Sequence, residues 1–149
     1  MNTLQINNKL VKVGGYLGTF PYDQLPRSKK KVFSLVVNTS SSHEPGTHWI
    51  AIVFINGTFY FLDSYGRNIN DMTFSKPFKR VIKQYFDGKR YKYNTKLLQP
   101  FTSNTCGDYA IYFVVMLSCG FSLEKCIAVF TDNLIYNDVY VQSFVKHLK

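Results

Sequence analysis

The chain has 149 residues, of which 46% are hydrophobic and 17% aromatic, and its formal net charge is +9. This length and apolar content predict one globular domain over residues 1–149. No apolar run approaches the about 20 residues that a membrane-spanning helix needs, and residues 1–13 lack the continuous hydrophobic core of a secretory signal. We therefore expect a monomeric intracellular protein without membrane contact.

The sulfur and imidazole groups are few: Cys106, Cys119, Cys126, His43, His48 and His147. Their spacing matches neither a disulfide framework nor a zinc motif. An odd and sparse cysteine count is typical of a reducing compartment and leaves at least one thiol free. The sequence thus predicts no metal and no cofactor.

The positive charge is concentrated in two clusters. One comprises Arg27 and Lys29 to Lys31; the other comprises Lys76, Lys79, Arg80, Lys83, Lys89, Arg90, Lys92 and Lys96, interleaved with aromatic residues. Such surfaces attract polyanions, so DNA is a candidate partner. A solvated basic face that keeps the protein soluble explains the same pattern.

In chain order, the first clear element is a buried strand at residues 32–38, where β-branched and apolar residues run together. A polar loop at residues 40–45 then leads into two apolar runs on either side of Asn56-Gly57. This dipeptide favours a type I′ turn, since both central residues of that turn need a positive φ. The sequence therefore predicts a β-hairpin.

A two-residue turn also fixes which residues of the hairpin face each other. Ile50 then faces Asp63, and His48 faces Tyr65. These four side chains share one face of the ribbon, so His48 and Asp63 become diagonal neighbours with Cβ atoms about 7 Å apart or closer. An imidazole and a carboxylate can bridge that gap.

The rest of the chain predicts helices around this hairpin. The expected elements are a basic amphipathic helix at residues 74–86, a strand at 91–98, a buried helix from Cys106 to Met116 or Ser118, a helix opened by Ser122, and a last helix at 137–148. The predicted fold class is α+β, with a central mixed or antiparallel β-sheet flanked by helices.

Cys106 stands where the buried helix begins, directly after the polar run Ser103-Asn104-Thr105. Helix N-terminal amides lower the pKa of a thiol toward neutrality, especially beside an imidazolium. The thiolate is the nucleophilic form of cysteine. Taken alone, the position suits a buried structural cysteine equally well.

Three further residues favour a catalytic role. His48 and Asp63 supply a base and a carboxylate that orients it, both on one face of the hairpin. Gln99 precedes Cys106 in the loop that enters the same helix, where its amide can donate to an oxyanion together with the Cys106 N–H. The predicted catalytic residues are His48, Asp63, Gln99 and Cys106.

The segments GTHWIAIVF, FLDSYG and QPFTSNTCGDYAIYF resemble the motifs of adenovirus-type (adenain-like) maturation proteases, within the clan that includes SUMO- and ubiquitin-like-protein proteases. The resemblance implies a papain-like cysteine protease core with His48 as general base, Asp63 as its acidic partner, Gln99 as oxyanion donor and Cys106 as nucleophile. The adenoviral enzymes carry glutamate at the position of Asp63, have more C-terminal helical residues, and bind an activating peptide through an upstream cysteine that this chain lacks.

The resemblance also implies a function. It predicts a viral or virus-derived cysteine endopeptidase that cleaves capsid and core precursor proteins after small residues such as glycine, with DNA as a candidate activator. Its expected location is the virion and the host cytoplasm or nucleus. Two alternatives stay open: an isopeptidase that removes ubiquitin or SUMO-like modifiers, and a basic nucleic-acid-binding capsid module with a relict active site.

Overall fold

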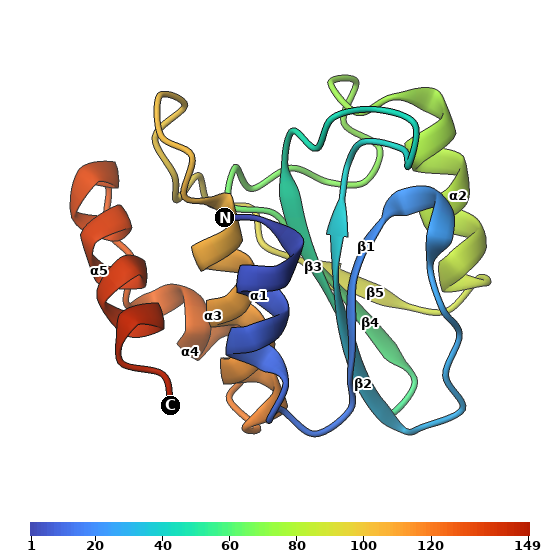
Figure 1. The fold of residues 1–149 in the computed structure, drawn as a ribbon, viewed down its shortest axis with the longest axis horizontal. Coiled ribbons are helices and arrows are strands. Elements are labelled where there is room, and N and C mark those ends of the chain that lie inside the picture. Colours follow the sequence, from blue (N-terminus) through green and yellow to red (C-terminus); the bar gives the residue numbers. More distant parts are fainter.

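A five-stranded mixed β-sheet lies at the centre of the computed structural model, which describes residues 1–149 (Figure 1). The strands follow the order of the chain: β1 (Tyr16–Pro21), β2 (Val32–Asn38), β3 (Trp49–Ile55), β4 (Thr58–Leu62) and β5 (Tyr91–Tyr93). The two outer pairs are parallel and the two inner pairs are antiparallel. The predicted α+β class with a mixed sheet is confirmed.

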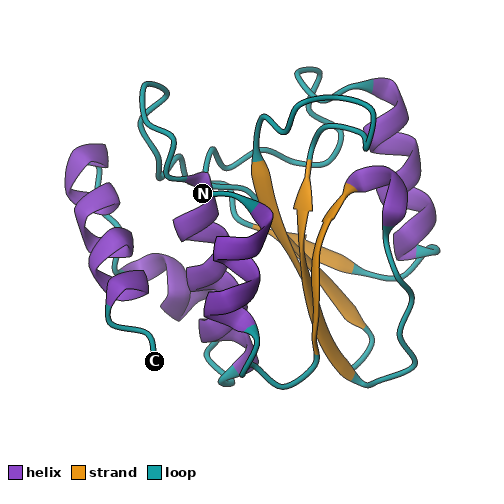
Figure 2. Cartoon of the chain, viewed as in Figure 1, coloured by secondary structure: helices purple, strands orange, loops and turns teal.

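Helices cover both faces of this sheet (Figure 2). They are α1 (Thr3–Leu10), α2 (Lys76–Phe86), α3 (Cys106–Ser118), α4 (Leu123–Ala128) and α5 (Leu134–Lys146), with a short 3-10 helix at Tyr22–Gln24. Helix α2 lies on one face, whereas α1 and α3 lie on the other, with α5 outside α3. None of the helices is long and apolar enough to cross a membrane.

The alternation of side chains along β3 creates a separate hydrophobic core on each face. Ile50 and Ile52 are buried in the core beneath α2, whereas Ala51 and Val53 are buried in the core beneath α3. A strand covered on both faces needs apolar residues at every position, which explains the unbroken apolar run in the sequence. Each fully buried aliphatic side chain of this kind contributes about 1.5–3 kcal/mol relative to exposure.

The hairpin has the predicted register. Ile55 pairs with Thr58, and the ladder continues to Ala51 and Leu62. Asn56 and Gly57 adopt φ values of 46° and 93°, which is the requirement that favours these residues in a type I′ turn. Pairing ends at Leu62, so His48 and Asp63 lie just outside the two strand ends.

The strand predicted at residues 91–98 is shorter in the structure, because β5 ends at Tyr93. The cause is Asn94, whose buried side chain bonds to the backbone of Asp63. Asp63 N donates to Asn94 Oδ1 over 3.0 Å, and Asn94 Nδ2 donates to Asp63 O over 2.6 Å. A side chain therefore replaces the next rung of the ladder, and the chain leaves the sheet.

Three other elements differ from the expectation. Helix α1 and strand β1 were not predicted; α1 buries only Ile6 and Leu10, so its apolar stripe is narrow. Helix α5 covers Leu134–Lys146 rather than residues 137–148, because the Asn133 side chain caps it by accepting from Tyr136 N. The helix predicted to open at Ser122 is present as α4, with Ser122 as its N-cap.

We expect the turn after β4 to depend on the absence of a side chain at Gly66. This residue has a φ of 72°, and a Cβ there would lie 2.6 Å from Lys96 O. Gly88 also has a φ of 72° but nothing within 4 Å of its Cβ position. Gly88→Ala should therefore lower the free energy of unfolding by the backbone strain alone, about 1–2 kcal/mol, and Gly66→Ala by clearly more. Equal losses of unfolding free energy for the two variants in urea denaturation would contradict the predicted clash at Gly66.

Candidate active site

His48 and Asp63 form an ion pair beyond the end of the hairpin. His48 Nε2 lies 2.7 Å from Asp63 Oδ1, and the aspartate side chain has no exposed surface. His48 directly precedes β3 and Asp63 directly follows β4, so the register of the hairpin brings them together. The proximity predicted from the Asn56-Gly57 turn is therefore present in the structure.

Asp63 is also held by Arg67, a residue that sequence reasoning missed. Arg67 Nε donates to Asp63 Oδ2 over 2.6 Å, and the Arg67 backbone N–H donates to the same oxygen over 3.2 Å. Burial would raise the pKa of the Asp63 carboxyl, but the hydrogen bonds and charges of His48 and Arg67 outweigh it and hold the pKa below its ordinary value. Asp63 is thus a carboxylate held between the His48 ring and the Arg67 guanidinium.

Cys106 is the first residue of α3 and is only 9% exposed. Its Sγ accepts a hydrogen bond from Trp49 N over 3.5 Å. Thr105, at the N-cap position, gives no side-chain capping bond, and its Oγ1 donates to Asp138. Asp108 N donates to Thr105 O over 2.9 Å, whereas the N–H groups of Cys106 and Gly107 have no backbone acceptor.

His48 and Cys106 shift each other's protonation in opposite directions. Burial would raise the pKa of the Cys106 thiol, but His48 and the N–H groups of Trp49 and Gly107 lower it below its ordinary value. Burial would lower the pKa of His48, but Asp63 and Cys106 raise it above its ordinary value. Both directions favour a thiolate beside an imidazolium.

Gln99 is buried beside the same group of residues. Ser64 Oγ donates to Gln99 Oε1 over 2.5 Å, and the backbone N–H of Gln99 donates to Ser64 O. Gln99 Nε2 donates to Ser103 O over 3.0 Å and to Ser103 Oγ over 3.2 Å. Gln99 is therefore fixed beside Ser64, the residue that follows Asp63 in the chain. Its side-chain amide bonds to its own loop and does not line the cleft at Cys106.

Helix α5 supports the loop between Gln99 and Cys106 through two buried polar residues that the sequence did not single out. Asp138 Oδ1 accepts from Thr105 Oγ1 and lies 2.8 Å from Tyr109 Oη. Asn137 Nδ2 donates to Leu98 O over 3.0 Å. One turn of α5 thus holds both ends of the loop, although nothing in its local sequence separates these residues from an ordinary polar helix face.

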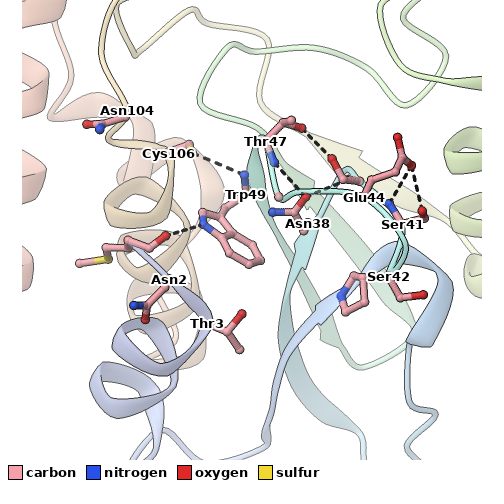
Figure 3. A pocket seen from close by; sticks show the side chains of 14 residues that line it. Asn2, Thr3, Asn38, Ser41, Ser42, Glu44, Thr47, Trp49, Asn104 and Cys106 are labelled. Atoms are coloured by element: carbon pink, nitrogen blue, oxygen red, sulfur yellow. Dashed lines mark hydrogen bonds between the residues drawn. The ribbon is translucent and has the colours of Figure 1, made fainter.

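A cleft of about 520 Å³ opens on one side of Cys106 (Figure 3). Trp49 lines it beside Cys106, and its Nε1 donates to Met1 O over 3.1 Å. Short polar side chains dominate the lining, which comprises Met1, Asn2, Thr3, Pro21, Asn38, Ser40, Ser41, Ser42, Glu44, Gly46, Thr47, Trp49, Asn104 and Cys106. Glu44 has the only charged side chain in that set.

The same residues offer no site for a metal ion. No group of three or more His, Cys, Asp or Glu side chains is close enough to hold one. Cys106, Cys119 and Cys126 are all free thiols, and burial raises the pKa of Cys126 to about 11. Among the three thiols, only Cys106 lies beside an imidazole.

Two solved structures share this fold. The crystal structure of the ASFV pS273R protease aligns with a TM-score of 0.63 at 15% sequence identity, over 99% of this chain and 67% of that chain. The central domain of the uncharacterized Lpg1148 protein from Legionella pneumophila aligns with a TM-score of 0.54 at 11% identity, over 100% of this chain and 98% of that chain. No protein-family model and no curated protein sequence matches the chain. The likeness shows that the chain shares its fold with these two structures, and membership of the adenovirus-type branch stays a prediction.

We expect Arg67→Gln to lower stability at neutral pH and to make stability less sensitive to acid. A carboxyl whose folded pKa is lowered contributes stability above its unfolded pKa, and this is lost as the pH falls through the folded pKa. Removing Arg67 raises the folded pKa of Asp63 toward its unfolded value, so the variant has less of this stability to lose as the pH falls. At neutral pH the variant should lose about 1–3 kcal/mol of unfolding free energy, and the difference from the wild type should shrink toward about pH 3.

Arg27→Gln is the matched control for this measurement. Arg27 also lies over a tyrosine ring and donates to two backbone carbonyls, Tyr85 O and Gln84 O, but it has no carboxylate partner. Its loss of stability should not change between neutral and acidic pH. The same pH dependence for both variants would show that Arg67 does not act through Asp63.

Proposed function

We propose that this protein is a cysteine endopeptidase of the viral type. The observation that carries the proposal is the chain of contacts Cys106–His48–Asp63, with the thiol at the start of α3 and opposite pKa shifts on thiol and imidazole. The fold shared with the ASFV pS273R protease supports it. In this proposal His48, Asp63, Gln99 and Cys106 keep the roles that the sequence indicated.

The thiolate of Cys106 attacks the carbonyl carbon of a peptide bond, and a C–S bond forms as the carbonyl oxygen takes the negative charge. In our proposal His48 enters this step protonated, with its Nε2 bound to Asp63 and its other nitrogen left for the thiol. The carboxylate keeps the ring in this orientation and stabilises the imidazolium. Arg67 fixes the second oxygen of that carboxylate.

The oxyanion needs donors at the entrance of α3. The Cys106 N–H is one, since it has no partner within the helix. Gln99 Nε2 is the second in our proposal, and it would exchange its 3.2 Å bond to Ser103 Oγ for the developing oxyanion. His48 then protonates the leaving nitrogen, the C–N bond breaks, and water hydrolyses the thioester with His48 as base.

The cleft supports an extended peptide with small residues before the scissile bond. Its lining of serine, threonine, asparagine and glycine offers polar contacts to a peptide backbone, and the Trp49 side chain lines it next to Cys106. We propose capsid and core precursor proteins as substrates during virion maturation, in the virion and the host cytoplasm or nucleus. Modifier conjugates ending in glycine are the alternative substrates, which would make the enzyme an isopeptidase.

The exposed lysines and arginines of α2 favour DNA as an additional partner. They lie on α2, which covers one face of the sheet, whereas Cys106 begins α3 on the other face (Figure 1). In our proposal, DNA bound there would leave the cleft open to a substrate. The same surface would serve the alternative in which the protein binds nucleic acid and the active site is a relict.

A proteome-derived peptide library with blocked amines tests the proposal, because every cleaved peptide bond exposes a new amine that mass spectrometry can sequence. Wild-type protein should produce new termini, and Cys106→Ala should produce none. Gln99→Ala should lower kcat about a hundredfold or more, while Cys106 still reacts with iodoacetamide.

Cys119→Ala is the matched control, because it removes an exposed cysteine at the far end of α3. It should leave cleavage unchanged. Release of a modifier from a Gly-Gly isopeptide conjugate without peptide cleavage would favour the isopeptidase. Salt-dependent DNA binding with no reaction at Cys106 would favour the relict module and contradict the proposal.

A further inference from the structure

Phe101 is a large apolar side chain that is 75% exposed beside the candidate active site. It lies in the loop between Gln99 and Cys106, which projects past the start of α3 (Figure 1). Its ring stacks on Tyr65 with centroids 5.2 Å apart and planes 30° apart. The Phe101 ring is not part of either hydrophobic core.

Tyr65 connects Phe101 to the catalytic histidine. The Tyr65 ring stacks on the His48 imidazole with a centroid distance of 4.9 Å and an interplanar angle of 13°. The Arg67 guanidinium lies over the same tyrosine, 5.2 Å from its centroid. Tyr65 is therefore held between fixed neighbours, and Phe101 extends the aromatic surface outward from the imidazole.

The position of the leaving amine determines which part of a peptide substrate contacts Tyr65 and Phe101. The acid that protonates the leaving nitrogen must lie within hydrogen-bond reach of it, so the leaving segment is on the His48 side of Cys106. The cleft of about 520 Å³ contacts Cys106 but none of His48, Tyr65 and Phe101. The cleft therefore receives the acyl segment, and the leaving segment passes the aromatic surface.

We propose that Tyr65 and Phe101 form a binding subsite for a large apolar side chain, aromatic or aliphatic, at one of the first two residues after the scissile bond. The proposal rests on the peptidase function proposed above. The His48–Tyr65 and Tyr65–Phe101 centroid distances together place the Phe101 ring no more than about 10 Å from the imidazole. Two or three residues of an extended peptide span this distance. A third ring or a branched chain stacked on Phe101 removes its exposed face from water.

The subsite predicts a preference for apolar residues just after the scissile bond. The blocked-amine library measures this preference directly, because the new amino terminus is the first residue of the leaving segment. Wild-type protein should enrich Phe, Tyr, Leu, Ile and Met at the first or second position of the new termini. Phe101→Ala should reduce that enrichment about 3–10-fold, while termini with small or polar residues form at the wild-type rate. Phe101→Leu should restore much of the preference, since it restores an apolar surface.

Phe121→Ala is the matched control, because Phe121 is a partly exposed phenylalanine beyond the other end of α3. It should leave the preference intact, and thermal unfolding would show that both alanine variants fold. New termini without an apolar preference, or a preference unchanged in Phe101→Ala, would overturn the subsite and leave the peptidase in place. A complete absence of Cys106-dependent termini would overturn both.

Discussion

A buried carboxylate at the end of the hairpin is the constraint on which the site depends. Asp63 has no exposed surface, and a buried charge is tolerated only when other charges and hydrogen bonds compensate its desolvation. His48 and Arg67 provide this compensation at the two carboxylate oxygens. The Asn94 side chain bonds to both the N–H and the C=O of Asp63 and so fixes its backbone. The position of the imidazole is therefore a consequence of how the strand pair ends.

The thiol comes to this imidazole from a different part of the chain, and α5 helps to place it. Asp138 accepts from the Thr105 hydroxyl directly before Cys106, and Thr105 gives no side-chain capping bond to α3. Asn137 fixes the other end of the same loop through Leu98 O. Two polar residues of one helix turn thus support the nucleophile, while the apolar body of α3 packs against the sheet.

Turn chemistry made the histidine–aspartate pair predictable, because Asn56-Gly57 admits few hairpin geometries and so fixes distant pairings. The strands around it and the buried body of α3 were predictable from their apolar runs. Arg67, Asn94 and Asp138 were not, since each is an ordinary polar residue locally and gains its role from a partner far along the chain or across a turn. The predicted strand at residues 91–98 was too long for the same reason. Nothing in the local sequence shows that the Asn94 side chain ends the pairing after Tyr93.

The most direct test of the coupled thiol and imidazole is the rate of Cys106 alkylation by iodoacetamide between about pH 5 and about pH 10, read at its own peptide by mass spectrometry. His48 and the helix amides lower the pKa of the thiol, so the wild-type rate should persist below the ordinary cysteine range. His48→Ala removes the imidazolium, and the midpoint should move to higher pH. Identical pH profiles for the two proteins would contradict the ion pair on which the proposed catalysis depends.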